Sequence, residues 1–182
     1  MPIFRPGPGP YALALAMTGV RLGERLLYIG SGTPAMFAAL AAKVGVSGRA
    51  AAVDEEQAGS SALEQAGTRQ GVLVETRQTQ LGYLPFESDA FDLIVVDRTR
   101  MTTDAAAAWL PDARRVLRAG GRLVVAERLA LGGLRALFGG AVSPPAPPTA
   151  AIDALTAAGF RPARVIAERD GWRFTEGMRP VS

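Results

Sequence analysis

A glycine turn and two aspartates that follow apolar runs are the residues of this 182-residue chain best suited to binding a ligand. The turn Gly30-Ser31-Gly32-Thr33 comes directly after the apolar run 26–29, and a second apolar run, 50–53, ends at Asp54. Because glycine has no Cβ, the turn can bring its backbone close to a ligand, and an acid about 20 residues further on can bind ribose hydroxyls. This order of strand, turn, helix, strand and acid predicts a nucleoside-binding βαβ unit.

Asp97 is the second aspartate, and it ends the apolar run 91–96. An unbroken apolar run of this kind is typical of a strand that is buried on both faces of a parallel sheet. Ligands bind at the carboxyl ends of such strands, so Asp97 is expected to face the same ligand as Asp54. The alternative is that Asp97 only caps the loop that follows it.

The composition excludes several classes of active site. The chain contains neither Cys nor His, which rules out disulfides, thiolate or imidazole metal sites and triads that need imidazole, and we expect no metal. The net charge is +3, but the basic residues are dispersed, so nucleic-acid binding is not expected. No apolar run approaches the roughly 20 residues of a membrane span, and a cytoplasmic protein is expected.

The segments between these residues must position them, and their patterns predict alternating helices and strands. The glycine turn leads into a helix that Ser31 or Thr33 can cap, with Pro34 in its first turn, where a missing N–H costs nothing. Gly71 ends the next helix, and Ala119-Gly120-Gly121 ends the helix before the fifth strand. The other expected helices are 11–18, 56–70 and 103–117, and the other expected strands are 72–75 and 122–126.

The C-terminal part of the sequence predicts a helix followed by a hairpin. Thr149 is expected to cap a helix over 150–158. A tight turn at Arg169-Asp170-Gly171 is expected to join strands over 160–167 and 172–176.

Before this helix, residues 139–148 are too rich in proline for regular structure and form either a lid or a linker. A short helix over 131–138 would place Leu134 and Phe138 either on a substrate cavity or over the sheet.

The chain is expected to form a single domain over residues 1–182, because 48% of its residues are hydrophobic and can build one core. Residues 1–20 are expected to be an N-terminal arm followed by a short helix. Phe4 and Tyr11 of this segment either pack on the sheet or close over the ligand.

Four sequence blocks carry a resemblance to a known family. They are LLYIGSGTP with AAVD after it, LPFESDAFDLIVVD, ARRVLRAGGRLVVAE and AAGFRPARVIAERDGWRF, and they span most of the chain. In this order they resemble the class I S-adenosylmethionine-dependent methyltransferases. The resemblance implies an α/β fold with a Rossmann-like, doubly wound, seven-stranded sheet of order 3-2-1-4-5-7-6, in which the last strand is antiparallel. The C-terminal hairpin agrees with this independently.

The resemblance also implies a site for S-adenosylmethionine. It places the glycine turn against the methionine part of the cofactor, Asp54 on the ribose with Glu55 beside the adenine, and Asp97 beside the transferred methyl group. Gln80 and Leu81 take positions that contact the adenine. The cofactor-binding residues implied in this way are Tyr28, Gly30, Ser31, Gly32, Asp54, Glu55, Gln80, Leu81 and Asp97.

Three positions depart from the pattern of the family. Tyr28 replaces the acid of the first strand, Pro34 replaces the third glycine, and Gln80 replaces an acid that contacts the adenine. The amide oxygen of Gln80 can still accept a hydrogen bond from the adenine amino group. Tyr28 removes a negative charge from the methionine end, and Pro34 adds bulk near the ligand.

The function implied is methyl transfer from S-adenosylmethionine to a small-molecule acceptor. With no His in the chain, Asp97 is the candidate catalytic base, assisted by Tyr11 or Arg98, and Arg98 and Thr99 lead toward the substrate. Two alternatives stay open. One is a non-catalytic methyltransferase-like module that binds a partner, and the other is a nicotinamide dehydrogenase, against which the RVLRAGGRLVV block and the hairpin argue. The sequence also leaves a homodimer open.

Overall fold

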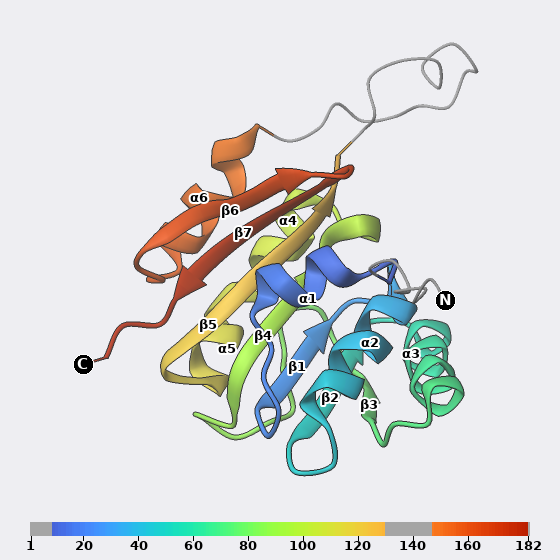
Figure 1. Ribbon diagram of the computed structural model, residues 1–182. Helices are drawn as coiled ribbons and strands as arrows, with labels where there is room; N and C mark the ends of the chain where they lie inside the picture. The colour runs from blue at the N-terminus through green and yellow to red at the C-terminus, as the bar shows by residue number, and fades with distance from the viewer. Residues whose placement is uncertain (1–8, 130–146, 182) are drawn as a thin grey trace.

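Seven strands form one mixed sheet in the computed structural model, which describes residues 9–129 and 147–181 (Figure 1). The strands are β1 (Arg25–Ile29), β2 (Arg49–Asp54), β3 (Glu75–Gln78), β4 (Phe91–Asp97), β5 (Leu117–Arg128), β6 (Ala163–Arg169) and β7 (Trp172–Met178). Their order is β3-β2-β1-β4-β5-β7-β6, and β7 is antiparallel to both of its neighbours. The sheet implied by the four sequence blocks is confirmed.

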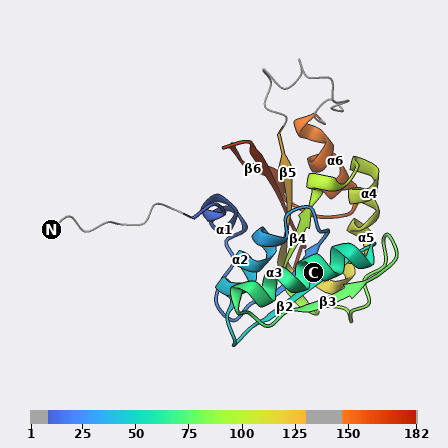
Figure 2. The same ribbon diagram turned by 90° about the vertical axis from the view of Figure 1, so that its right-hand side faces the viewer.

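Helices cover both faces of this sheet (Figure 2). They are α1 (Ala12–Thr18), α2 (Pro34–Val44), α3 (Gln57–Gln70), α4 (Thr103–Ala108), α5 (Leu110–Val116) and α6 (Pro148–Ala157), with a 3₁₀ turn, η1 (Arg98–Arg100), after β4. Side chains alternate along a strand, so Leu26 and Tyr28 pack beneath α1, α2 and α3, whereas Leu27 and Ile29 pack beneath α4, α5 and α6. No helix in the described ranges is long and apolar enough to cross a membrane.

The register of the central strands brings the predicted ligand-binding residues to one edge of the sheet. Ile29 of β1 lies opposite Val53 of β2 and opposite Val96 of β4. The next residues along these strands are Gly30, Asp54 and Asp97. Parallel strands end at the same edge, and in open α/β sheets that edge is where ligands bind.

The single helix expected over 103–117 is wrong, because the structure has two helices, α4 and α5. Pro111 lies in the first turn of α5, where its missing N–H is tolerated, but it cannot continue the hydrogen-bond ladder of α4. The fifth strand starts at Leu117 instead of covering only 122–126. The glycines expected to end the helix therefore lie inside β5, where Gly120 has a φ of 70°.

The third strand is displaced from its expected position, 72–75. It begins at Glu75, whose partner on β2 is Ala51. Val74 packs instead against the core beneath α1, α2 and α3, beside Gly67 of α3. Val72 and Val74 thus pack under the end of a helix and do not belong to the strand, whereas β3 itself is polar because it is an edge strand.

The C-terminal hairpin forms as expected, with Asp170 and Gly171 as its turn. Both residues have positive φ, which is the turn geometry that suits the twist of two antiparallel strands. The cap expected for α6 is wrong, since the helix begins at Pro148, before Thr149, and has no side-chain capping bond. The backbone of Pro148 lacks an N–H and so suits the first turn of a helix.

Some expectations fall on residues outside the described ranges. These are the helix over 131–138 with Leu134 and Phe138, most of the proline-rich stretch 139–148, and Phe4. Tyr11 is described, and it packs against the core beneath α1, α2 and α3.

Candidate active site

A cavity of about 290 Å³ lies at the carboxyl ends of β1, β2 and β4. The predicted residues that line it are Ser31, Gly32, Asp54, Glu55 and Asp97. Glu55 also lines an adjoining, more open groove together with Gln80 and Leu81. The structure thus brings most of the predicted cofactor-binding residues to two adjoining hollows, while Tyr28 and Gly30 are buried and line neither.

Asp54 ends β2 with its side chain in the cavity wall, only 8% exposed. Its Oδ1 accepts a hydrogen bond from the backbone N–H of Glu56 at 2.9 Å. Gly59 of α3 lies against this carboxylate, because a Cβ there would overlap it and would lie 2.6 Å from Ser31 Oγ. A glycine inside a helix costs about 1 kcal/mol relative to alanine, so the space needed by Asp54 and Ser31 explains Gly59. Gly59 was not among the residues predicted for the site, although a glycine inside an expected helix was a signal for it.

Asp97 ends β4 and is fully buried, yet it contributes to the cavity wall. Tyr28 Oη donates a hydrogen bond to its Oδ2 at 2.7 Å. Thr99 donates two to its Oδ1, from the backbone N–H at 3.0 Å and from the hydroxyl at 2.6 Å. Asp97 makes no ion pair with any residue of the described ranges. Neutral donors therefore engage both of its oxygens.

Tyr28 takes the place of the first-strand acid of the resembling family. Burial raises its pKa well above the ordinary value of 10.0, and the charge of Asp97 raises it further. The phenol thus stays protonated and acts as a hydrogen-bond donor. Its hydroxyl also lies 3.3 Å from the carbonyl oxygen of Thr33. Tyr28 influences the cavity through Asp97 and is not itself part of the cavity wall.

The glycine turn after β1 packs closely against the loop after β4. Gly30 has a φ of 97°, and a Cβ there would lie 2.5 Å from Met101 Cε. A Cβ at Gly32 would overlap Thr99 Oγ1. Both glycines are therefore needed for the contact between the two loops. The side chain of Thr33 makes no capping bond to α2, and its hydroxyl lies 3.4 Å from that of Thr99.

The charged side chains of the cavity wall are mostly acidic. They are the carboxylates of Asp54, Glu55, Glu56 and Asp97 and the guanidinium of Arg100. None of them makes an ion pair with another described residue. A wall with this charge attracts cations and repels a pyrophosphate group. Arg100 and Met101 were missed from the sequence, because only the fold brings η1 to the cavity.

Arg98 does not line the cavity, and it forms a mostly buried ion pair with Glu127 instead, Nη1 to Oε1, at 2.6 Å. This pair ties η1 to the end of β5. Pro34 is the first residue of α2 and is also absent from the cavity wall. Across residues 9–129 and 147–181, no group of three or more Asp, Glu, Cys or His side chains is placed to hold a metal ion.

A family model described as "Methyltransferase domain" matches residues 27–125, which is more than half of the chain. The chain belongs to the class I S-adenosylmethionine-dependent methyltransferase family. S-adenosylmethionine is the cofactor of this family, which agrees with the cofactor that the sequence blocks imply.

Solved structures of methyltransferases have the same fold. A SAM dependent methyltransferase from Aquifex aeolicus is 18% identical, with a TM-score of 0.76 and 94% of each chain covered. A SAM-dependent O-methyltransferase from Thermotoga maritima is 17% identical, with a TM-score of 0.70, and 100% of this chain and 68% of that chain are covered. At such identities the likeness establishes the fold and leaves the acceptor undetermined.

A curated relative is the uncharacterized 37.1 kDa protein in transposon TN4556 of Streptomyces fradiae. It is 38% identical over 109 residues. The match covers 59% of this chain and 31% of the relative, so the matched segment spans less than a third of the relative's length.

Proposed function

We propose that this methyltransferase transfers the methyl group of S-adenosylmethionine to a small-molecule acceptor. The observation that carries the proposal is the acidic cavity with the buried carboxylate of Asp97 in its wall. S-adenosylmethionine is cationic at its sulfonium and its amino group, whereas a nicotinamide dinucleotide carries an anionic pyrophosphate. The negative charge of the wall therefore favours S-adenosylmethionine and argues against a nicotinamide dehydrogenase.

The residues of the two hollows suit the nucleoside part of the cofactor. Asp54 offers carboxylate oxygens to the ribose hydroxyls, and its position is fixed by the Glu56 N–H and by the space above Gly59. The adjoining groove offers Gln80 as a hydrogen-bonding partner for the adenine and Leu81 as an apolar surface.

Asp97 suits the cationic methionine end. In this chain Tyr28 replaces the first-strand acid, and its hydroxyl holds the Asp97 carboxylate by a 2.7 Å hydrogen bond. The negative charge at this end of the cavity therefore comes from Asp97 on β4. Because Tyr28 and Thr99 already engage both oxygens of Asp97, we assign this residue to attracting the cation and orienting the reactants, and not to removing a proton.

When bound, S-adenosylmethionine supplies a methyl group that is already activated, so the protein mainly has to align the acceptor with it. The residues available for this lie in η1 and at the start of α4, where Arg100, Met101 and Thr102 form one wall of the cavity. Arg100 is the cation of that wall and can orient a polar acceptor. The small cavity suits a compact acceptor better than a polymer.

The acceptor class can be tested with S-adenosylmethionine that carries a tritium-labelled methyl group. A cell extract is divided into small-molecule, nucleic-acid and protein fractions, and each is incubated with the enzyme and with its Asp54→Asn variant. Label in the small-molecule fraction that requires Asp54 is expected. Label in nucleic acid or protein would contradict the proposed acceptor, and no label in any fraction would favour the non-catalytic alternative.

A further inference from the structure

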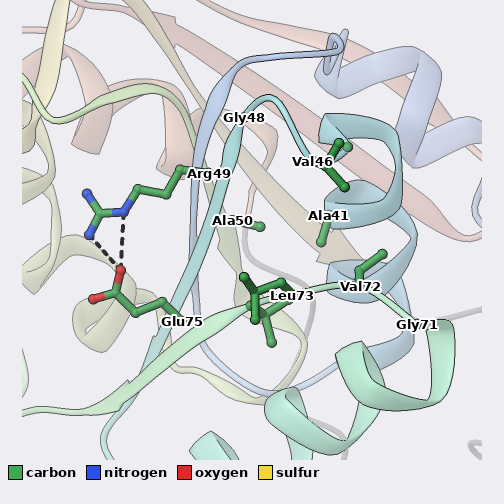
Figure 3. A pocket seen from close by; sticks show the side chains of 11 residues that line it. Ala41, Val46, Gly48, Arg49, Ala50, Gly71, Val72, Leu73 and Glu75 are labelled. Atoms are coloured by element: carbon green, nitrogen blue, oxygen red, sulfur yellow. Dashed lines mark hydrogen bonds and ion pairs between the residues drawn. The ribbon is translucent and has the colours of Figure 1, made fainter.

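A second cavity, of about 510 Å³, lies at the opposite end of β2 from the candidate active site (Figure 3). Its walls come from the last turns of α2, the start of β2, Gly71 after α3 and the residues that lead into β3. It shares no lining residue with the acidic cavity. The second cavity is therefore separate from the candidate active site, at the other end of the same strand.

The interior of this second cavity is apolar. Its uncharged lining residues are Ala41, Gly45, Val46, Gly48, Ala50, Gly71, Val72, Leu73 and Val74. The two charged lining residues, Arg49 and Glu75, are joined to each other by a 2.7 Å ion pair and turn aside from the aliphatic group (Figure 3). The guanidinium of Arg49 also lies 5.1 Å from the ring centroid of Phe91. The volume is in the range of small-ligand sites, about 300–1,000 Å³.

Large apolar side chains gather at the mouth of the cavity. Val46 is 106% exposed, Leu73 is 96% exposed and Leu22 is 74% exposed. Leu22 belongs to the same mouth, because a Cβ on Gly45 would lie 2.6 Å from its Cδ1. Clusters of exposed apolar residues are typical of surfaces that bind a ligand or another protein.

The chain segments at the rim of the cavity contain exposed cations. The chain segments that form or border the mouth are 21–24, 41–49 and 67–75. Their acids, Glu24 and Glu75, are both ion-paired. Arg21, Lys43 and Arg69 of these segments make no ion pair within the described ranges. An apolar space bordered by unpaired cations is complementary to an apolar molecule that carries a negative charge.

We propose that this second cavity binds an amphipathic anion, a small molecule with an apolar body and one acidic group, such as a medium-chain carboxylate. The aliphatic walls take the body, and the cations of the rim attract the acidic group. A second copy of the chain fits less well, because a symmetric contact would bring the two positively charged rims together.

Binding of 8-anilinonaphthalene-1-sulfonate, an apolar anion that fluoresces in an apolar site, tests this. The folded protein is expected to bind one probe per chain, and decanoate is expected to displace it. Val46→Asp adds a negative charge at the mouth and is expected to weaken binding at least tenfold. The matched control Val181→Asp, at another exposed valine, should leave binding unchanged. Absence of saturable binding at millimolar probe, or equal binding by both variants, would overturn the proposal.

Two further measurements separate the parts of the proposal. Ala41→Leu fills the apolar space and should abolish probe binding while S-adenosylmethionine binding is retained. The double variant Lys43→Gln with Arg69→Gln should weaken binding of the sulfonate probe but not binding of the neutral N-phenyl-1-naphthylamine. An unchanged affinity for the sulfonate would overturn the role of charge. Light scattering that showed a dimer broken by Val46→Asp would assign the surface to a second copy and contradict the proposal.

Discussion

The side chains of Tyr28 and Asp97 join β1 to β4 at the candidate active site. The family has an acid in the first strand, and this chain has a buried tyrosine whose hydroxyl donates to Asp97 on the neighbouring strand at 2.7 Å. Burying a carboxylate that has no ion-pair partner among the described residues lowers the free energy of unfolding, and such groups are typical of ligand-binding sites. The two hydrogen bonds from Thr99 offset part of this loss.

Replacing Tyr28 with Phe is predicted to lower the free energy of unfolding by about 1.5–3 kcal/mol, because it removes a hydrogen bond to a buried charge. It should also weaken S-adenosylmethionine binding several-fold, because Asp97 loses the donor that orients it. Urea denaturation and calorimetric titration measure the two effects. Tyr83→Phe is the matched control, since Tyr83 is exposed, and it should change neither value. Equal behaviour of the two variants would contradict the role of Tyr28.

The pKa of Tyr28 also predicts how stability depends on pH. Burial, and then Asp97, raises this pKa well above 10.0, so the folded state holds the phenolic proton more tightly than the unfolded state does. The contribution of the neutral phenol to stability is therefore complete below pH 10.0 and is lost as the pH rises toward the folded-state pKa. Unfolding measured above pH 10.0 should show a steeper loss of stability in the wild type than in Tyr28→Phe. Parallel curves would exclude Tyr28 as the cause.

Gly59 is predicted to act on cofactor binding through Asp54. Alanine is the better helix former by about 1 kcal/mol, yet its Cβ would overlap the Asp54 carboxylate. Gly59→Ala should therefore weaken S-adenosylmethionine binding about tenfold or more with little loss of stability. Gly67→Ala, in the same helix but facing Val74, should affect packing and leave the affinity unchanged. An unchanged affinity in Gly59→Ala would show that the Asp54 carboxylate has room to move.

At the scale of elements, the sequence predicted the strands that are buried on both faces and missed the polar edge. β1, β2 and β4 are continuous apolar runs because helices cover both of their faces, so their ends, and with them Asp54 and Asp97, could be predicted. β3 is an edge strand of sequence ETRQ, and the apolar residues Val72 and Val74 before it pack against the core under α3. The break between α4 and α5 at Pro111 was available from the sequence, but the helical pattern on either side of it concealed the break.

Asp92 joins three strands at the edge of the sheet opposite the acidic cavity. Its carboxylate accepts hydrogen bonds from the backbone N–H of Arg25 on β1 at 2.8 Å and from Arg118 Nε on β5 at 2.6 Å. Burial acts to raise the pKa of Asp92, but the hydrogen bonds from Arg25 and then Arg118 outweigh it and hold this pKa well below its ordinary range. The charged form of Asp92 therefore stabilises the sheet.

Asp92→Asn is predicted to lower the free energy of unfolding by about 1–3 kcal/mol near neutral pH. Because the folded-state pKa lies below the unfolded value of 3.8, this contribution is present above pH 3.8 and is lost as the pH falls through the folded-state pKa. Urea denaturation at several pH values should therefore show the wild type and variant converging in acid. Asp170→Asn, in an exposed ion pair, is the control and should cost less than about 1 kcal/mol. Equal losses in both variants would contradict the role of Asp92.

At the scale of the whole molecule, the candidate active site is assembled by loops that are distant in the sequence. The glycine turn, Asp54 and Asp97 follow three different strands, and the register of the sheet brings them together. Strand ends could be predicted from the sequence, so the convergence of these residues at one edge of the sheet could be predicted too. Arg100 and Met101 could not be predicted, because their place in the cavity wall depends on how η1 packs against those loops. The only signal for Gly59 was a glycine inside an expected helix, and its contact with Asp54 depends on how α3 packs. The apolar cavity at the other end of β2 is likewise formed by segments that are distant in the sequence.

The central claim is that the acidic cavity at the carboxyl ends of β1, β2 and β4 binds S-adenosylmethionine. Isothermal titration of the purified protein with S-adenosylmethionine, and with NAD as the control ligand, tests it most directly. We predict micromolar binding of S-adenosylmethionine, no binding of NAD, and an affinity at least tenfold lower in Asp54→Asn at unchanged thermal stability. Folded protein that gives no heat with millimolar S-adenosylmethionine, or that binds NAD equally well, would contradict the claim.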